Sequence, residues 1–349
     1  MAAQEARAAI MRPLISLVMI VGNETDEFVR CVKSLAGLFD ELCIVITGTN
    51  PQTVEIAKSF GAKILISPWQ ADFAYHRNQA IALASGVWIL VCDADESAID
   101  TNFEETRYHL MHDKLPDVLL VREVVVAANG HQAVLLQPRL FRKDSGIKYI
   151  YPIHEQLNVE AADSGTTNVI LLHHGYVDHE THLAKERRNI AIAREMGDHS
   201  HGLHSRARSA LALGEWAEVL ECTRKLISMP VSPIILVEAC VLGARAAYET
   251  RNGEAFDLFI AKGREVAPHS PDIRYMELLA AAHTYLMTLG PEGDSVAKGD
   301  FVRPYVMWHD RRQVELVVKV LLGELRLAQT PAGKPAGDEA VVKTETDPH

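Results

Sequence analysis

The sequence predicts an α/β domain with a Rossmann-like mixed sheet and helices on both faces, followed by an all-α domain of helical repeats. Three observations lead to this prediction. Short apolar runs alternate with segments of helical periodicity over residues 14–92, long helices drop out of the pattern after Asp117, and helical periodicity dominates residues 183–329. A length of 349 residues and an apolar fraction of 48% are enough for two packed cores.

The first part of the chain alternates between strands and helices. Runs rich in β-branched and other apolar residues indicate strands at residues 14–21, 42–46, 62–66 and 88–92. Apolar residues at helical spacing indicate helices at residues 26–38, 53–60 and 73–84. Strands joined through helices pair in parallel, and buried parallel strands are continuously apolar, as these are.

The remaining chain divides into an antiparallel part and a helical part. Further strands are predicted at residues 118–128, 133–141, 147–153 and 168–173, with a hairpin turn at Asn129-Gly130. In the helical part, similar stretches surround Arg208 and Arg245, 37 residues apart, which is close to the tetratricopeptide period of about 34 residues. The predicted organisation is an N-terminal extension (1–13), an α/β domain (14–182), a helical-repeat domain (183–329) and a disordered tail (330–349).

Composition narrows the setting in which the protein works. The formal net charge of −11 disfavours non-specific binding to nucleic acid or anionic membrane. The five cysteines include no CxxC pair, which indicates a reducing cytoplasm rather than a disulfide framework or a cysteine zinc site. No apolar run reaches the roughly 18 residues that span a bilayer. Residues 14–21 continue into an acidic segment without a cleavage site, so we interpret them as a buried strand rather than a signal peptide.

An acidic cluster, Asp93-Ala94-Asp95-Glu96, directly follows the fourth predicted strand. Ligands of open α/β sheets bind at the carboxyl ends of the strands, so these carboxylates lie at the binding edge. Hard oxygen ligands suit Mg²⁺ or Mn²⁺, with water and a diphosphate completing the coordination. The alternative interpretation is a solvated acidic turn.

An ordered series of motifs around this cluster resembles the family 2 glycosyltransferases of the GT-A fold. The motifs are MIVGNET at residues 19–25, VITGTNPQT at 45–53, VEIAKSFGAK at 54–63, DFAYHRN at 72–78, WILVCDADE at 88–96, RLFR at 139–142, IHEQ at 153–156, HHGY at 173–176 and ERRN at 186–189. The resemblance covers about residues 14–190. A subset of this family carries helical repeats behind the catalytic domain.

The resemblance implies transfer of a sugar from a nucleotide-diphosphate sugar to an acceptor hydroxyl or thiol, usually with inversion. A base must then take the acceptor's proton, and Glu155 is the candidate, with His154 orienting it or contacting the donor diphosphate. The implied ligands of Mn²⁺ or Mg²⁺ are Asp95, Asp93 and His173. The implied donor-binding residues lie in the quoted motifs: Asn23, Glu24, Thr47, Gly48, Arg77, Asn78 and Asp93.

Three departures from the family pattern surround the expected nucleotide pocket. Ile46 replaces an aspartate that hydrogen-bonds the base, Pro51 replaces a second aspartate, and Gly22 replaces a lysine. They indicate either an active enzyme with an altered donor pocket, which we favour, or a domain that has lost activity. If the pocket otherwise has the family shape, Ile46→Asp should strengthen uridine-nucleotide binding.

Two other function classes remain open from the sequence. One is a catalytically silent nucleotide-sugar-binding domain on a helical-repeat scaffold. The other is a nucleotidyltransferase, which usually has a glycine-rich basic loop after the first strand, whereas residues 22–27 are acidic. For the transferase, a concave repeat surface favours a protein or peptide acceptor. Glycan, lipid and modified nucleobase acceptors stay open, as do a homo-oligomer and a separate zinc site among the histidines of residues 173–204.

Overall fold

The computed structural model describes residues 12–99, 101–126, 132–159, 163–174 and 179–288, with side chains as far as residue 281. The chain divides into two compact units, with the division between Lys262 and Gly263. Most of the predicted N-terminal extension, the hairpin turn at Asn129-Gly130 and the tail at residues 330–349 lie outside the described residues. The domain boundaries stay predictions.

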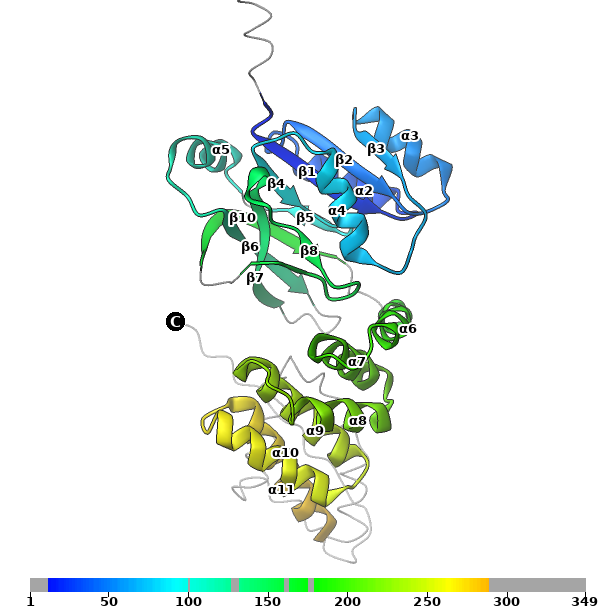
Figure 1. Ribbon diagram of the computed structural model, residues 1–349, viewed down its shortest axis with the longest axis vertical. Coiled ribbons are helices and arrows are strands. Elements are labelled where there is room, and N and C mark those ends of the chain that lie inside the picture. The colour runs from blue at the N-terminus through cyan, green and yellow to red at the C-terminus, as the bar shows by residue number, and fades with distance from the viewer. Residues whose placement is uncertain (1–11, 100, 127–131, 160–162, 175–178, 289–349) are drawn as a thin grey trace, which may run out of the picture. The chain divides into compact units, whose positions relative to one another are not determined.

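An eight-stranded mixed sheet forms the centre of the first unit, in the order β3-β2-β1-β4-β7-β6-β10-β5 (Figure 1). Its strands are β1 (Ile15–Val21), β2 (Glu41–Ile46), β3 (Lys63–Ile66), β4 (Trp88–Val91), β5 (Glu96–Ala98), β6 (Val118–Val126), β7 (Gln132–Arg142) and β10 (Ser164–His173). Strands β3, β2, β1 and β4 are parallel, and β7 is antiparallel to both β4 and β6. The predicted α/β fold with a mixed sheet is confirmed.

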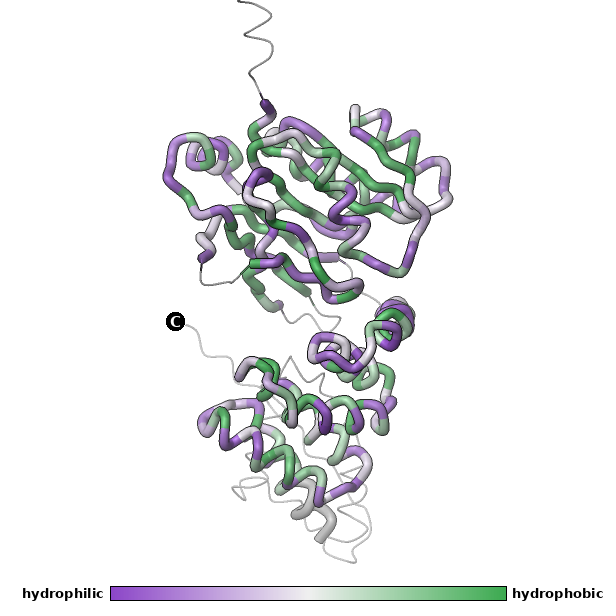
Figure 2. Tube along the Cα trace, in the orientation of Figure 1, coloured by the Kyte–Doolittle hydropathy of each residue, from purple (hydrophilic) through white to green (hydrophobic). Residues whose placement is uncertain are grey.

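Helices cover both faces of this sheet, as the apolar periodicity predicted. On one face, α2 (Asp26–Ser34), α3 (Pro51–Ser59) and α5 (Phe103–His112) contribute side chains to the core cluster that includes β1 and β4. On the other face, α4 (Phe73–Leu83) packs against the alternate residues of the same strands. Figure 2 shows the central strands as continuously apolar, which a parallel strand covered on both faces requires.

The second half of the sheet differs in detail from the prediction. The strand predicted at residues 147–153 is instead the start of a separate two-stranded sheet, β8 (Tyr149–Ile150) paired with β9 (Gln156–Leu157). In addition, β10 pairs in parallel with β6, so this half is not wholly antiparallel. The connection between β8 and β9 therefore holds Ile153, His154 and Glu155 of the IHEQ motif in a turn, and Gln156 begins β9.

The chain beyond the sheet is helical as far as it is described. The helices are α6 (His179–Glu195), α7 (Ser200–Leu213), α8 (Trp216–Leu226), α9 (Pro233–Glu249), α10 (Gly253–Val266) and α11 (Pro271–Thr288). Gly214 ends α7 in a left-handed conformation, and Ser232 caps α9 before a proline at its first position, so the helix boundaries follow ordinary capping chemistry. No helix among the described residues is long and apolar enough to cross a bilayer.

Candidate active site

Arg77 is the centre of the candidate site and joins two of the predicted residues. Its side chain extends from α4, is 7% exposed, and donates from Nε to Glu155 Oε1 over 2.6 Å. Its Nη2 lies 2.8 Å from Asp93 Oδ1. Burial alone would lower the pKa of Arg77, but the charges of Asp93 and Glu155 outweigh it and raise that pKa. The structure thus connects the helix after β3, the end of β4 and the β8–β9 turn through one guanidinium.

Arg139 on β7 makes a second link on the opposite side of Asp93. Its Nη1 lies 3.1 Å from Asp93 Oδ2, and its Nη2 lies 3.0 Å from Glu96 Oε1 and 3.5 Å from Glu123 Oε2. Burial would raise the pKa of Asp93, but Arg77 and Arg139 lower it well below its usual range. Asp93 is therefore a charged carboxylate held between two guanidinium groups.

Asp95 contacts a different pair of residues. Its Oδ2 lies 3.2 Å from His173 Nε2 on β10 and 3.2 Å from Lys185 Nζ on α6. Burial opposes both charges, yet the mutual contact lowers the pKa of Asp95 and raises that of His173. The backbone of this pair is fixed too, because His174 N donates to the carbonyl of Asp95 over 2.8 Å.

Asp95 and His173 fit a divalent cation as two of its ligands. Ligand bonds of about 2.1 Å at right angles place two ligand atoms about 3.0 Å apart, close to the observed 3.2 Å. Asp93, the third predicted ligand, is directed to the two arginines instead. No group of three or more His, Cys, Asp or Glu side chains arranged to hold a metal occurs in the described part of the chain. The metal ligands stay a prediction, with water and diphosphate needed to complete the coordination.

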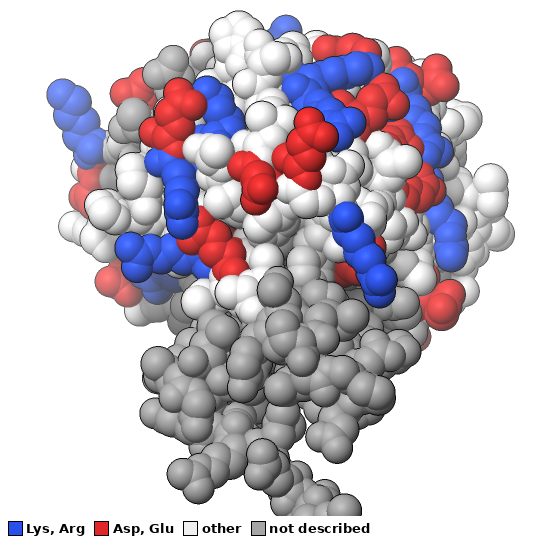
Figure 3. Space-filling model, turned by 90° about the horizontal axis from the view of Figure 1, so that it is seen from below, with Lys and Arg blue, Asp and Glu red and all other residues white. Residues whose placement is uncertain are grey.

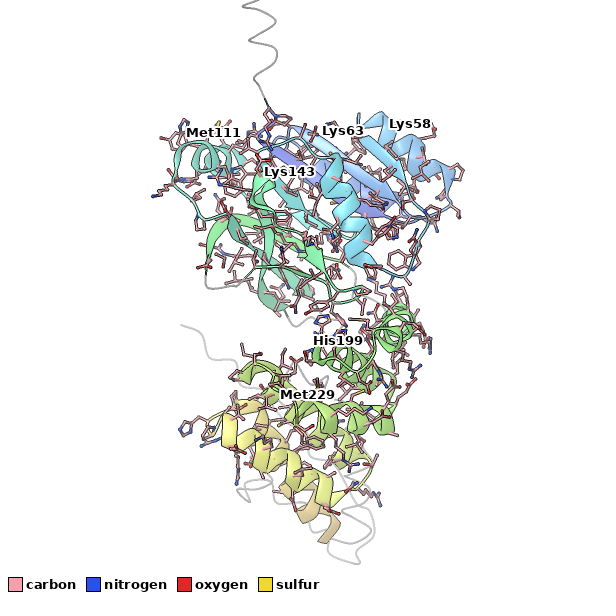
Figure 4. The ribbon with its side chains drawn as sticks, in the orientation of Figure 1. Lys58, Lys63, Met111, Lys143, His199 and Met229 are labelled. Carbon is pink, nitrogen blue, oxygen red and sulfur yellow. The ribbon has the colours of Figure 1, made fainter. Side chains whose placement is uncertain are left out.

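The turn that carries His154 and Glu155 has an unusual backbone. Tyr151 and His154 have φ values of 72° and 50°, a region that non-glycine residues rarely adopt. Helix α7 holds the turn, because the His201 ring stacks on Tyr151 with centroids 3.8 Å apart and its Nε2 lies 3.0 Å from the Ile153 carbonyl oxygen. His199, labelled in Figure 4, begins the same helix as its N-cap residue.

His154 cannot supply a positive charge near neutral pH. Burial, together with the charge of Arg208, lowers its pKa to about 3. Its Nε2 is buried without a hydrogen-bond partner among the described residues. Two roles are predicted for His154, orienting Glu155 or contacting the diphosphate, and a neutral imidazole would have to perform either one.

The donor-side residues predicted on the first two loops lie together at the carboxyl ends of β1 and β2. Asn23 Oδ1 accepts hydrogen bonds from Thr49 N (2.8 Å) and Asn50 N (2.9 Å), so it connects the two loops. A Cβ on Gly48 would lie 2.3 Å from the Gly22 carbonyl oxygen, so only glycine fits there. Thr47 N donates to the Val21 carbonyl and the Glu24 carbonyl accepts from Thr53. These contacts bring the loops together, while donor binding by them stays a prediction.

Two residues of the expected donor site have structural contacts. The side chain of Asn78 pairs with both backbone groups of Tyr149, each over 2.9 Å, so it anchors β8. Ile46 is 1% exposed and packs in the main core cluster, so an aspartate there would be buried among apolar groups. The expectation that Ile46→Asp improves uridine binding is therefore withdrawn.

Three histidines of residues 173–204 have different hydrogen-bond or ion-pair partners. His173 contacts Asp95, His201 contacts the β8–β9 turn, and His204 Nε2 lies 3.0 Å from Glu238 Oε2 on α9. We do not propose a separate zinc site, because these side chains face different partners.

Sequence reasoning missed three charged residues of the site: Arg139, Glu123 and Lys185. Glu123 had a usable signal, since it stands with Arg122 between the apolar runs VLLV and VVV and shares the face of the buried Val121. Arg139 lies in the quoted RLFR motif but received no role. Lys185 had no signal beyond its proximity to the ERRN motif, because only the packing of α6 brings it to Asp95.

Comparison with known proteins places this site in a family. Residues 16–158 match the family model described as glycosyl transferase family 2. A TPR repeat-containing protein of Synechococcus elongatus is 40% identical over 141 residues, which are 40% of this chain and 34% of that protein. The SPbeta prophage-derived glycosyltransferase SunS of Bacillus subtilis is 27% identical over 197 residues, covering 53% of this chain and 45% of SunS.

The chain thus spans less than half the length of these two relatives. Among solved structures, S. aureus TarS aligns over 72% of this chain and 55% of its own, with 14% identity and a TM-score of 0.43. The family model covers the strands β1 to β9, and therefore the segments that carry Arg77, Asp93, Asp95 and Glu155. Residues 16–158 of this chain therefore match glycosyl transferase family 2.

Proposed function

We propose that this chain transfers a sugar from a nucleotide-diphosphate sugar to an acceptor hydroxyl or thiol, in a single displacement that inverts the anomeric carbon. The observation that carries the proposal is the ion-paired group of Arg77, Asp93 and Glu155. The three residues come from separate segments of the family 2 domain and meet in a buried site. Buried, charged side chains that converge at the carboxyl edge of such a sheet are typical of a site for charged substrates.

Glu155 is the residue to which we assign the base. Its Oε1 is held by Arg77, which fixes the orientation of the carboxylate, and its side chain is 13% exposed. We assign Oε2 to the acceptor's proton. A positioned base of this kind contributes about 10²–10⁴-fold to the rate. Attack from the side opposite the departing diphosphate inverts the anomeric centre.

Arg77 also offers an N–H group that can donate a hydrogen bond to the sugar nucleotide. Its Nη1 is buried and has no hydrogen-bond partner among the described residues. A buried guanidinium N–H without a partner is costly, so a ligand oxygen there would stabilise the site. A phosphate oxygen or a sugar hydroxyl has the required chemistry.

A divalent cation is the expected cofactor, Mn²⁺ or Mg²⁺, held by Asp95 and His173. Bound there, it would act as a Lewis acid that offsets the charge of the leaving diphosphate. Mn²⁺ fits this pair better than Mg²⁺ because it accepts imidazole more readily.

The silent binding domain is the second candidate, and Ile46 is the observation that favours it. A buried isoleucine cannot accept the hydrogen bond that the family aspartate makes to the nucleotide base. The backbone near Thr47 or the side chain of Asn50, on the loop that follows, could recognise the base instead. This second candidate predicts nucleotide binding without turnover.

A protein or peptide is our first proposal for the acceptor. Helical repeats present surfaces suited to such ligands. On the face drawn in Figure 3, the acidic and basic side chains of the described residues are interspersed and do not form one basic patch. Nucleic acid recognition depends on concentrated positive charge, so this face does not favour it.

The test is donor hydrolysis by the full chain across UDP-, GDP-, CDP- and ADP-sugars, with Mn²⁺ and with excess chelator. We expect turnover of at least one donor with Mn²⁺, lost in Asp95→Asn. The control Glu55→Gln, an exposed α3 residue with 70% of its side chain accessible, should retain it. Binding of a nucleotide sugar without turnover would support the silent domain, and activity unaffected by chelator would refute the metal.

A further inference from the structure

The residue that the proposed mechanism leaves unused is Lys185. Its ammonium lies 3.2 Å from Asp95 Oδ2, the same oxygen that His173 Nε2 approaches at 3.2 Å. Asp95 belongs to the acidic cluster that follows β4, whereas Lys185 belongs to α6, ninety residues further along the chain. A positive side chain from outside the family-matching segment therefore reaches the carboxylate assigned to the metal.

Helix α6 presents more than one side chain to the site. Arg188 lies three residues after Lys185 and therefore on the same helix face. Its guanidinium carbon is 4.9 Å from the centroid of the Phe73 ring, at the start of α4. Burial lowers the pKa of Arg188, against the opposing charges of Glu186, Glu155 and Glu24. This face of α6 thus carries one cation at Asp95 and a second at the start of α4.

We propose that Lys185 binds the diphosphate of the donor, and that Asp95 holds its ammonium in position before the donor arrives. This inference rests on the proposed function. A divalent cation on Asp95 Oδ2 would repel an ammonium at the same oxygen, so the lysine must find another anion when the metal binds. The donor diphosphate is the anion that arrives with the metal. A lysine on a flexible stem is a suitable point charge for phosphate.

The experiment compares diphosphate with monophosphate binding, which isolates the outer phosphate. Wild type, Lys185→Met and Lys185→Arg are titrated calorimetrically with UDP, GDP, CDP and ADP and with the matching monophosphates, in Mn²⁺ and in chelator. We expect Lys185→Met to weaken the best-binding diphosphate about tenfold or more and its monophosphate by less than about twofold. Lys185→Arg should retain most of the wild-type affinity for the diphosphate because it keeps the positive charge.

Lys58→Met is the matched control. Lys58 lies on α3, where Figure 4 labels it, with 60% of its side chain exposed and an ion pair to Glu55. Lys58→Met removes one positive charge from a surface position, so the affinities for diphosphate and monophosphate should both stay unchanged.

Three other results would contradict the role of Lys185 or the proposed function. If Lys185→Met binds diphosphate as wild type does, the role of Lys185 is wrong while the proposed function stands. If it weakens diphosphate and monophosphate equally, Lys185 acts on the nucleoside or on the fold, and the inference fails. If wild type binds none of the nucleoside diphosphates, the proposed function fails with it.

Discussion

Replacing Arg77 by methionine should destabilise the fold even without substrate. The guanidinium contacts Glu155 at 2.6 Å and Asp93 at 2.8 Å, and its side chain is 7% exposed. Removing one partner of a buried ion pair leaves an uncompensated charge, which costs about 3–5 kcal/mol. Arg139 still neutralises Asp93 in this variant, so the carboxylate left without a cation is Glu155. The free energy of unfolding of Arg77→Met should therefore fall by about 3 kcal/mol or more.

Urea unfolding at pH 7, followed by circular dichroism, measures this loss. The control is Arg107→Met, which breaks a more exposed pair with Asp40 and should cost about 1 kcal/mol or less. Adding Glu155→Gln to Arg77→Met should recover part of the loss, because the unpaired charge disappears, with a coupling of about 1–3 kcal/mol. A loss in Arg77→Met no larger than in Arg107→Met, or no recovery in the double variant, would refute the buried bridge.

Four further outcomes are expected. Asp95→Asn should reduce Mn²⁺-dependent donor hydrolysis by orders of magnitude with the fold preserved in circular dichroism, and full activity in chelator would contradict this. Glu155→Gln should abolish transfer in a product assay while donor affinity stays within a few-fold, whereas a parallel collapse of affinity would move Glu155 to the donor site. Burial would raise the pKa of Glu41, but Lys63 and other hydrogen-bond partners lower it to about 2. The stabilisation from the charged Glu41 is therefore present above about pH 4.5 and is lost as the pH falls toward 2. In pH-dependent unfolding, wild type should lose about 1–3 kcal/mol more than Glu41→Gln across that range, and equal losses would argue against this role of Glu41. Ile46→Asp should lose about 3 kcal/mol or more in thermal unfolding because a carboxylate replaces a core side chain, and a stable variant that binds UDP more tightly would show that this strand end faces the base.

The parallel half of the sheet was predictable because continuous apolar runs and apolar residues at helical spacing encode it locally. The β8–β9 hairpin was not, since strands of two residues leave no periodicity and its shape depends on Asn78 and α7. Pairing of β10 with β6 depends on contacts between distant segments, and no local pattern specifies it.

In the candidate site, too, residues in local motifs could be predicted, whereas contacts between distant segments could not. Asp93 and Asp95 could be located because they follow a strand, and Arg77 and Glu155 because they lie in motifs. The partners of these two carboxylates could not be predicted, because tertiary packing determines them. Asp93 contacts two arginines, whereas Asp95 contacts His173 and Lys185. The donor, the acceptor and the cytoplasmic location stay predictions.

Because α7 supports the β8–β9 turn, this helix limits where such a chain can be shortened or joined to other helices. His201 and Tyr151 join the turn that bears Glu155 to a helix outside residues 16–158. A shortened protein that ends with the matched segment would keep every proposed catalytic side chain except His173 and Lys185, yet lose the brace behind Glu155. We therefore expect helices to be exchangeable between related chains only where α7 stays with the segment that carries Glu155.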